Sequence, residues 1–241
     1  MRGGGWLRAI RLDLDRVEDR DVYPYTLRAV QALEHEVTLD PAVTFLVGEN
    51  ASGKSTIIEA LAVAAGFNAE GGSRNFNFET RSSTSSLHQT LRLVRDVRRP
   101  STGFFLRAES FFNVATQVEE LGLDQAYGDR GLHEQSHGES FLSLALHRFG
   151  PNGLYLLDEP EAALSPQGCL TLLRRIHDLV DEGGQFIIAT HSPLLMAYPH
   201  ATIYELDDRG LERASYDETQ HVSLYRAFLA SPEAFLRHLL E

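Results

Sequence analysis

The sequence has only one cysteine, one lysine and one tryptophan in 241 residues. The single cysteine, Cys169, excludes an internal disulfide and any metal site built from several thiolates. The longest weakly apolar run, residues 60–67, is far shorter than the roughly 20 residues of a membrane-spanning helix. The first residues contain no apolar stretch typical of a secretory signal. We therefore expect a cytoplasmic protein that does not insert into a membrane directly.

Positive charge is also scarce and unevenly placed. The 22 basic residues face 34 acidic ones, and the resulting net charge of −12 disfavours non-specific nucleic-acid binding over most of the surface. Residues 74–107 are the exception, with seven arginines and two acids. On a helix, Arg92, Arg95 and Arg99 would share one face, and the region from Arg92 to Arg99 is the candidate contact for nucleic acid or a protein partner. A solvated face or ion pairs with the protein's own acids are the alternatives.

Apolar residues make up 43% of the chain, which is enough for a sizeable core. Residues 6–39 are expected to form short strands and loops, and residues 70–86 a loop. Apolar segments alternate with helical ones, which predicts an α/β fold with a mainly parallel sheet flanked by helices. The expected strands are 38–47, 104–107, 154–157 and 186–189, and the expected helices are 55–65, 111–121, 131–148 and 170–180.

A strand, a loop of small residues and a helix follow one another around residues 48–56. The loop fits the pattern G-x-x-x-x-G-K-[ST], in which backbone amides and the helix start surround phosphate oxygens. Lys54, the only lysine, would bring a mobile charge to the outer phosphates, and Ser55 would bind Mg²⁺. A ligand-free turn is the alternative. The expected phosphate-binding residues are Gly48, Glu49, Asn50, Ala51, Ser52, Gly53, Lys54, Ser55 and Thr56.

The apolar segment 154–157 ends in two adjacent carboxylates, Asp158 and Glu159. Neighbouring side chains on a strand point in opposite directions, so the two acids can have different tasks. We expect Asp158 to hold magnesium and Glu159 to polarise the attacking water. A solvated turn would have a similar composition.

With these elements and residues 135–139, the chain resembles the ABC ATPase superfamily, whose signature reads Leu-Ser-Gly-Gly-Gln. Ser136, Gly138 and Glu139 fall on its serine, second glycine and glutamine, while Gln135 and His137 depart from it. The resemblance implies that the signature of one subunit completes the ATP site of another. It therefore implies a homodimer on ATP binding. A capped helix without a ligand is the alternative for this segment.

The resemblance also assigns roles to isolated residues. His191, after the strand 186–189, is placed as the residue that contacts the γ-phosphate and positions water. Glu109 stands in place of the glutamine that contacts magnesium and water, although a structural carboxylate is the alternative. Ser165 occupies a position where aspartate is usual in the family. Tyr23 and Tyr25 are the candidates for stacking on adenine, with core packing as the alternative.

Within the superfamily, the chain is most similar to small stand-alone bacterial ATPases related to the DNA-repair and chromosome-maintenance branch. Residues 71–76 and 104–113 carry this similarity. The implied fold is a P-loop NTPase of the ABC type, one domain over residues 1–241. It would have a small N-terminal β part and a small lobe of loop and helix at about 68–150. Gly53 and Ser136 are too close in sequence for a coiled-coil arm.

Together these features predict an ATP hydrolase that uses ATP and Mg²⁺. Three interpretations of its role remain open. The chain could be a soluble ATPase switch in nucleic-acid maintenance or defence, the ATP-binding subunit of a membrane transporter, or a nucleotide sensor that does not hydrolyse ATP. The acidic pair and the histidine disfavour the sensor.

Overall fold

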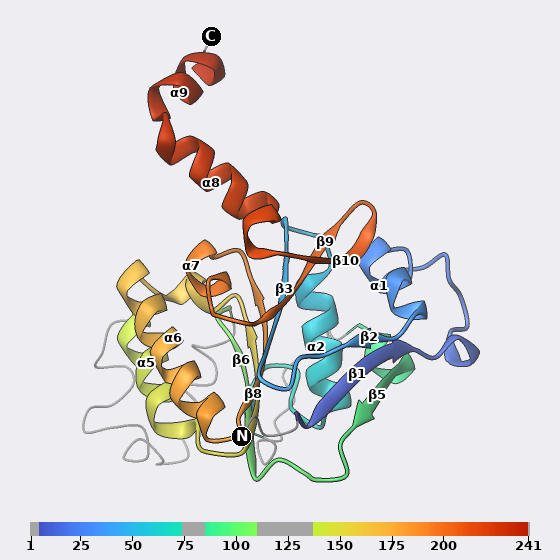
Figure 1. Ribbon diagram of the computed structural model, residues 1–241. Helices are drawn as coiled ribbons and strands as arrows, with labels where there is room; N and C mark the ends of the chain where they lie inside the picture. The colour runs from blue at the N-terminus through green and yellow to red at the C-terminus, as the bar shows by residue number, and fades with distance from the viewer. Residues whose placement is uncertain (1–4, 74–84, 110–136, 241) are drawn as a thin grey trace.

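The computed structural model describes residues 5–73, 85–109 and 137–240 (Figure 1). A seven-stranded sheet forms the centre of this part of the chain. The five inner strands are parallel to one another, and the two outer strands are antiparallel to their neighbours. The predicted mainly parallel α/β architecture is therefore confirmed. The strand order is β10 (Gly210–Ala214), β9 (Thr202–Asp207), β3 (Val43–Gly48), β8 (Gln185–Thr190), β7 (Gly153–Asp158), β6 (Thr102–Arg107) and β4 (Gly72–Ser73).

Every residue of β3, β7 and β8 is buried. A parallel strand that is covered on both faces needs apolar side chains on both, which explains the continuous apolar runs. In β3, Leu46 belongs to one core cluster, whereas Phe45 and Val47 belong to the other. The sheet thus separates two hydrophobic cores.

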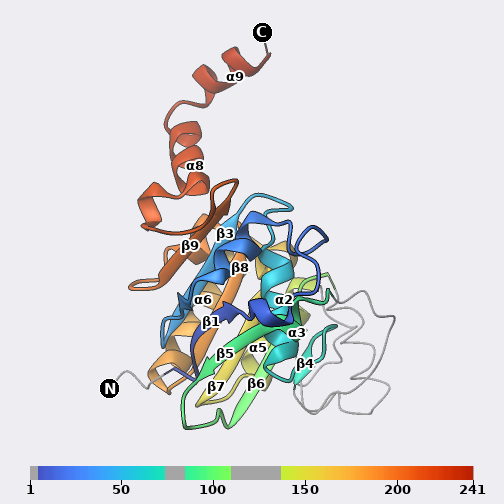
Figure 2. The same ribbon diagram turned by 90° about the vertical axis from the view of Figure 1, so that its right-hand side faces the viewer.

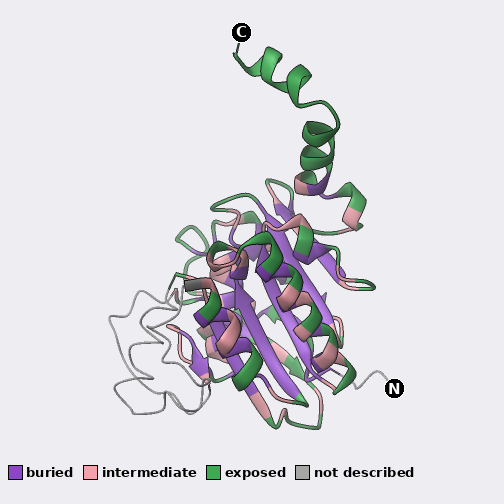
Figure 3. Ribbon diagram, turned by 90° about the vertical axis from the view of Figure 1, so that its left-hand side faces the viewer, coloured by how far each residue is buried: buried purple, intermediate pink, exposed green. Residues whose placement is uncertain are grey.

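Helices cover both faces of the central sheet. On the face turned toward the viewer in Figure 3, the outer sides of the helices are exposed. The first core contains the apolar face of α2, with Ile57, Ile58 and Leu61 fully buried. The second core contains Phe141 and Leu172 from two longer helices. The helices of the body are α1 (Arg28–Gln31), α2 (Lys54–Ala64), α3 (Leu87–Thr90), α5 (His137–Arg148), α6 (Pro166–Asp181) and α7 (Pro193–Met196).

A smaller antiparallel sheet packs on the side of α2 (Figure 2). It has the order β2 (Val37–Thr38), β1 (Leu7–Leu12) and β5 (Leu91–Arg95). Gln185 of β8 ties this sheet to the central one, because its side-chain oxygen accepts from the Leu7 amide at 2.9 Å and its nitrogen donates to the Leu7 carbonyl at 2.7 Å. The buried amide side chain is thereby satisfied at both ends.

The arginine-rich helix expected around residues 92–99 is wrong, because residues 91–95 form β5 beside β1. The strand follows from pairing with β1, which supplies backbone partners for a segment of apolar residues interspersed with arginines. Arg92 is ion-paired with Asp13 at 2.7 Å, and Arg95 donates to the Ala64 carbonyl at 2.7 Å. These two side chains therefore do not share a helical face.

Two other expectations differ in detail. The strand expected over 38–47 is divided into β2 and β3, because Asp40 and Pro41 form a turn in which the Asp40 carboxylate accepts from the Ala42 amide at 2.8 Å. Within residues 68–150, the strand expected at 104–107 is present as β6, and β4 and β5 are two further strands that were not expected. The helix expected at 111–121 and the beginning of the one at 131–148 lie outside the described residues.

Residues 14–16, 32–34, 160–163 and 216–218 form short 3-10 helices. After the last of these come α8 (Gln220–Ala230) and α9 (Pro232–Leu240), which we call the C-terminal arm. The arm leaves the body at the edge of the central sheet where β3 ends, and it projects away from the body (Figure 1). Only Val222 of the arm is buried. No helix in the described ranges has the length and apolar character needed to cross a bilayer.

Candidate nucleotide-binding site

The loop between β3 and α2 has a backbone that suits its small residues. Gly48 and Gly53 have φ angles of 151° and 101°, and Ala51 has a φ angle of 63°. A Cβ atom at position 48 would lie 2.3 Å from the Leu206 carbonyl oxygen, so glycine is required there. The first amides of a helix have no intrahelical partner, so the start of α2 offers hydrogen-bond donors of the kind that an anion site requires. The buried Ser52 hydroxyl also lacks a hydrogen bond to any described residue.

Lys54 is folded into this loop. Its side chain is 3% exposed, and its Nζ atom donates to the carbonyl oxygens of Gly48 and Glu49, each at 2.9 Å. The Glu159 carboxylate lies 3.8 Å from Nζ. Burial lowers the pKa of Lys54, although the charge of Glu159 opposes this shift. The ammonium group thus lies where phosphate oxygens would replace the two carbonyls.

Ser55 and Asp158 are brought together by α2 and β7. The Ser55 hydroxyl donates to the Asp158 carboxylate at 3.0 Å. Burial raises the pKa of Asp158 to about 6, against the opposing charge of Arg107 and the hydrogen bond from Ser55. One hydroxyl and one carboxylate fit Mg²⁺, which takes few protein ligands and completes its shell with phosphates and water. No group of three acidic, histidine or cysteine side chains that could hold a metal occurs in the described part.

Arg107, which the sequence did not single out, links three acids at the end of β6. Its guanidinium lies 2.7 Å from Glu59 and 3.4 Å from Asp158. Burial raises the pKa of Glu59, although Arg107 opposes the shift. Glu109, the expected magnesium contact, has an 86% exposed side chain 3.8 Å from Arg107. In the described structure, Glu109 is connected to Asp158 through this arginine.

Glu159 and His191 approach each other from the ends of β7 and β8. The His191 Nε2 atom lies 2.9 Å from the Glu159 carboxylate. Glu159 has left-handed backbone angles of 50° and 51°, which are uncommon for a residue with a side chain and are found most often at functional sites. Its amide donates to the Ala189 carbonyl at 2.9 Å. The strained turn therefore aims the carboxylate at the histidine.

Two further residues of this cluster were missed from the sequence. Glu161 accepts hydrogen bonds from the Thr190 hydroxyl at 2.7 Å and from the His191 amide. Its position two residues after the acidic pair was the available signal. His221 lies with Nε2 at 3.3 Å from Nδ1 of His191, and no motif marks it. Both residues hold the end of β8 in place.

The predicted signature lies partly in the described residues. Ser136 is outside them, while Gly138 and Glu139 lie in the first turn of α5. A Cβ atom at position 138 would lie 2.9 Å from the Ala163 carbonyl oxygen, so the start of α5 packs closely on the segment after the acidic pair. Ser165 caps α6 by accepting from the Gly168 amide at 3.1 Å. Serine and aspartate are comparable helix caps, which accounts for the residue found here.

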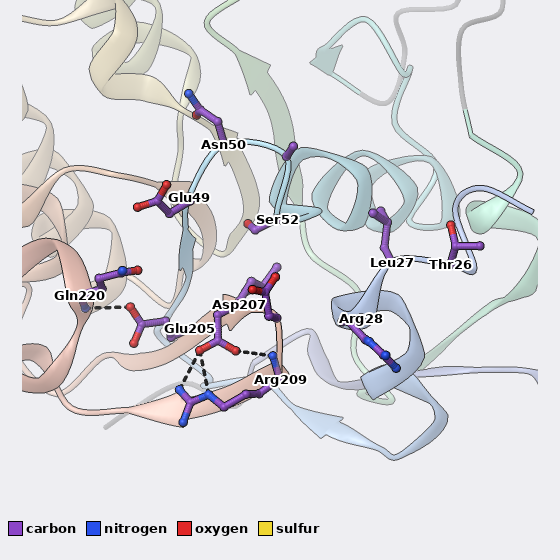
Figure 4. Close-up of a pocket in the computed structure, with 13 residues that line it drawn as sticks. Thr26, Leu27, Arg28, Glu49, Asn50, Ser52, Glu205, Asp207, Arg209 and Gln220 are labelled. Atoms are coloured by element: carbon purple, nitrogen blue, oxygen red, sulfur yellow. Dashed lines mark hydrogen bonds and ion pairs between the residues drawn. The ribbon is translucent and has the colours of Figure 1, made fainter.

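A cavity of about 950 Å³ adjoins the outer side of the loop (Figure 4). Its wall is acidic, with Glu205 bound to the Gln220 amide at 2.8 Å and Asp207 paired with Arg209 at 2.7 Å. Of the two tyrosines considered for adenine, Tyr25 is only 7% exposed and belongs to the core, so that candidate is excluded.

Tyr23, the second of these tyrosines, is the one accessible to a base. Its side chain is 61% exposed, and its hydroxyl lies 3.0 Å from the Thr56 hydroxyl. It therefore borders the helix that begins at the phosphate loop.

Comparison with known proteins connects this geometry to a family. The sequence profile of the family described as "AAA domain, putative AbiEii toxin, Type IV TA system" matches residues 43–104 and 139–197. These two segments contain the loop, the acidic pair and the histidine.

Two curated relatives match over shorter stretches. ABC transporter G family member STR2 of Medicago truncatula is 26% identical in an alignment of 174 positions, which covers 63% of this chain and 24% of that protein. A protein of Methanothermobacter marburgensis named "Putative ABC transporter ATP-binding protein" is 34% identical over 79 residues, 32% of this chain and 28% of its own length. The chain thus spans about a quarter of the length of the curated relatives it matches.

Among solved structures, cbiO1 from Clostridium perfringens, part of the ABC transporter complex cbiONQ, aligns over 98% of this chain and 99% of its own. The TM-score is 0.53 and the sequence identity is 15%. At that identity the similarity establishes the fold, which is that of an ABC-type ATP-binding domain.

Proposed function

Because the chain belongs to this AAA-domain family and has the fold of the ABC-type P-loop ATPases, we propose that it binds and hydrolyses ATP in a magnesium-dependent cycle. One observation carries the proposal. The phosphate loop with Lys54, the Ser55–Asp158 pair and the Glu159–His191 pair meet at one edge of the central sheet. Parallel α/β sheets bind their ligands at this edge, beyond the carboxyl ends of the strands.

In this proposal the loop residues 48–56 surround the phosphates with backbone amides, and Lys54 exchanges its two carbonyl partners for phosphate oxygens. Ser55 and Asp158 hold Mg²⁺, which neutralises charge on the phosphates when it is bound. The cavity beside the loop has room for the nucleoside, and Tyr23 is the accessible aromatic residue near α2.

Glu159 is the residue we assign to the attacking water. Its carboxylate lies within reach of both Lys54 and His191, so it borders the place where the terminal phosphate would lie. A carboxylate at that point accepts a proton from water, and His191 donates a hydrogen bond that orients it. The Glu161 carboxylate accepts a hydrogen bond from the His191 amide and so holds the backbone at this position.

We further propose that two copies close around two nucleotides. The start of α5, with Gly138 and Glu139, would supply backbone amides to the ATP of the second copy, together with Ser136. Hydrolysis would remove the charge that joins the copies and release them.

The test is magnesium-dependent ATP binding by calorimetry. We expect Lys54→Ala to lose binding by at least tenfold, because the buried ammonium is the main cation of the loop. Arg174→Ala is the matched control. The Arg174 side chain is 76% exposed on α6, away from the loop, so this substitution removes one positive charge without altering the candidate site. Absence of ATP uptake by the unaltered protein, or equal affinity in Lys54→Ala, would contradict the proposal.

A second pair of experiments distinguishes the cellular processes that ATP hydrolysis could drive. For a switch in nucleic-acid maintenance or defence, we expect ATP turnover to respond to double-stranded DNA and to lose this response at higher salt. For a transporter subunit, as the names of the curated relatives suggest, a multi-span membrane protein would co-purify instead.

A further inference from the structure

The first turn of α8 places a second histidine directly behind His191. The His221 Nε2 atom lies 3.3 Å from Nδ1 of His191, and the two ring centroids are 5.3 Å apart. On its other side, His191 Nε2 lies 2.9 Å from the Glu159 carboxylate. The three side chains therefore form a chain of contacts from the C-terminal arm to the end of β7.

The chemistry of these groups fixes where the protons are. A carboxylate oxygen only accepts, so the contact with Glu159 places the proton of His191 on Nε2. In the neutral ring, Nδ1 is then an acceptor and needs a donor. The Nε2–H group of His221 is the donor within reach.

The second ring is consistent with this assignment. If Nε2 of His221 carries the proton, its Nδ1 is bare, and this buried atom makes no hydrogen bond to any described residue. Burial lowers the pKa of His221, and a positive charge on His191, where present, would lower it further. Lys54 adds to this effect, whereas Glu49 and Glu205 oppose it. A neutral His221 follows.

His221 is also held firmly. The preceding Gln220 amide donates to the Glu205 carboxylate at 2.8 Å, which anchors the start of α8 to β9. Val222, on the other side, is 1% exposed and packs in the second core. The position of the ring is therefore fixed by both sequence neighbours.

We propose that His221 is a positioning residue that donates to Nδ1 of His191 and so holds the tautomer whose Nε2–H faces Glu159. Its effect on turnover rests on the proposed ATPase function, but the tautomer itself does not. Because His221 belongs to the first turn of the C-terminal arm, a displacement of α8 would also remove this hydrogen bond.

The test uses His221→Leu, which removes the donor, and His221→Gln, whose side-chain amide can still donate. Nitrogen NMR of histidine-labelled protein reports the protonated ring atom, with the His191 signals assigned from their loss in His191→Asn. We expect a proton on Nε2 of His191 in the unaltered protein and in His221→Gln, and mixed tautomers in His221→Leu. In turnover, His221→Leu should lower kcat on the order of tenfold with KM for ATP little changed, and His221→Gln should restore most of it.

Thermal unfolding of each variant shows whether it is folded, and His221→Gln keeps the test decisive if the leucine variant is not. A proton on Nδ1 of His191 in the unaltered protein would overturn the proposal. So would a leucine variant with unchanged tautomer and kcat, or a glutamine variant that loses the tautomer. An unaltered protein that hydrolyses no ATP would refute the proposed function, while the tautomer measurement would still decide the role of His221.

Discussion

Asp158 is an acid whose environment opposes its own charge in the nucleotide-free protein. It is 5% exposed, and its folded pKa of about 6 lies above the ordinary value of 3.8. Above pH 6 the buried Asp158 carboxylate is ionised and lowers the free energy of unfolding. This destabilisation disappears as the pH falls below 3.8, the ordinary pKa of aspartate, because the side chain is then neutral in both the folded and the unfolded state. Such a residue is suited to a cation, which would compensate the buried charge.

We expect Asp158→Asn to stabilise the nucleotide-free, magnesium-free protein by about 2–3 kcal/mol at pH 7.5, with the gain vanishing towards pH 4. Urea unfolding at several pH values measures the difference. Asp178→Asn, at a 40% exposed position on α6, is the control and should show no comparable gain. A destabilised Asp158→Asn at pH 7.5 would contradict this account of the site.

The candidate site residues proposed from the sequence are those with a local chemical pattern. Lys54, Asp158, Glu159 and His191 each follow a buried strand or begin a helix, and the parallel sheet brings these ends to one edge. His221 could not be predicted, because its contact joins residues 30 positions apart through the packing of α8. Long-range contacts of this kind leave no local pattern.

At the scale of elements, Ser165 caps a helix although aspartate is the usual residue of the family at this position. It accepts from the Gly168 amide and begins the 16-residue helix α6. We expect Ser165→Ala to destabilise the protein by about 1 kcal/mol, which corresponds to a loss of about 2–4 °C in Tm for a protein of this size.

Ser165→Asp is the matched variant, because aspartate is a comparable cap and stands at the amino end of a helix dipole. It should retain the Tm of the unaltered protein in circular dichroism melts without nucleotide. If the alanine variant melted normally, or if the aspartate variant melted equally early, the cap would not be what Ser165 provides.

The buried strands could be predicted because their apolar runs are continuous. The strand β5 could not be predicted in this way. Its apolar residues Leu91, Leu93 and Val94 are interspersed with two arginines, and the pairing with β1 makes the segment a strand. The turn at Asp40 and Pro41, which divides the strand expected over 38–47, carries a recognisable signal that the neighbouring apolar residues outweighed.

At the scale of the whole molecule, the proposed closure of two copies is directly measurable. We expect Glu159→Gln to bind ATP without turning it over, and therefore to accumulate as a dimer with a mass near twice 26.9 kDa. Light scattering after size exclusion, with and without ATP and Mg²⁺, detects the change. Hydrolysis-competent protein should dissociate again as ATP is consumed.

Glu182→Gln is the control, because Glu182 is an exposed acid at the end of α6. It should behave like the unaltered protein. A Glu159→Gln variant that binds ATP but remains a monomer would refute the closure of two copies and leave nucleotide binding intact.

The single tryptophan, Trp6, is an intrinsic fluorescence probe at a defined place in the fold. Trp6 is 7% exposed, and its indole nitrogen donates to the Gly153 carbonyl at 3.1 Å, joining the start of β1 to the start of β7. Gly153 lies at the amino end of the parallel strands, opposite the phosphate loop. Fluorescence emission will therefore follow separation of the smaller sheet from the central one during unfolding. It will stay nearly silent when nucleotide is added.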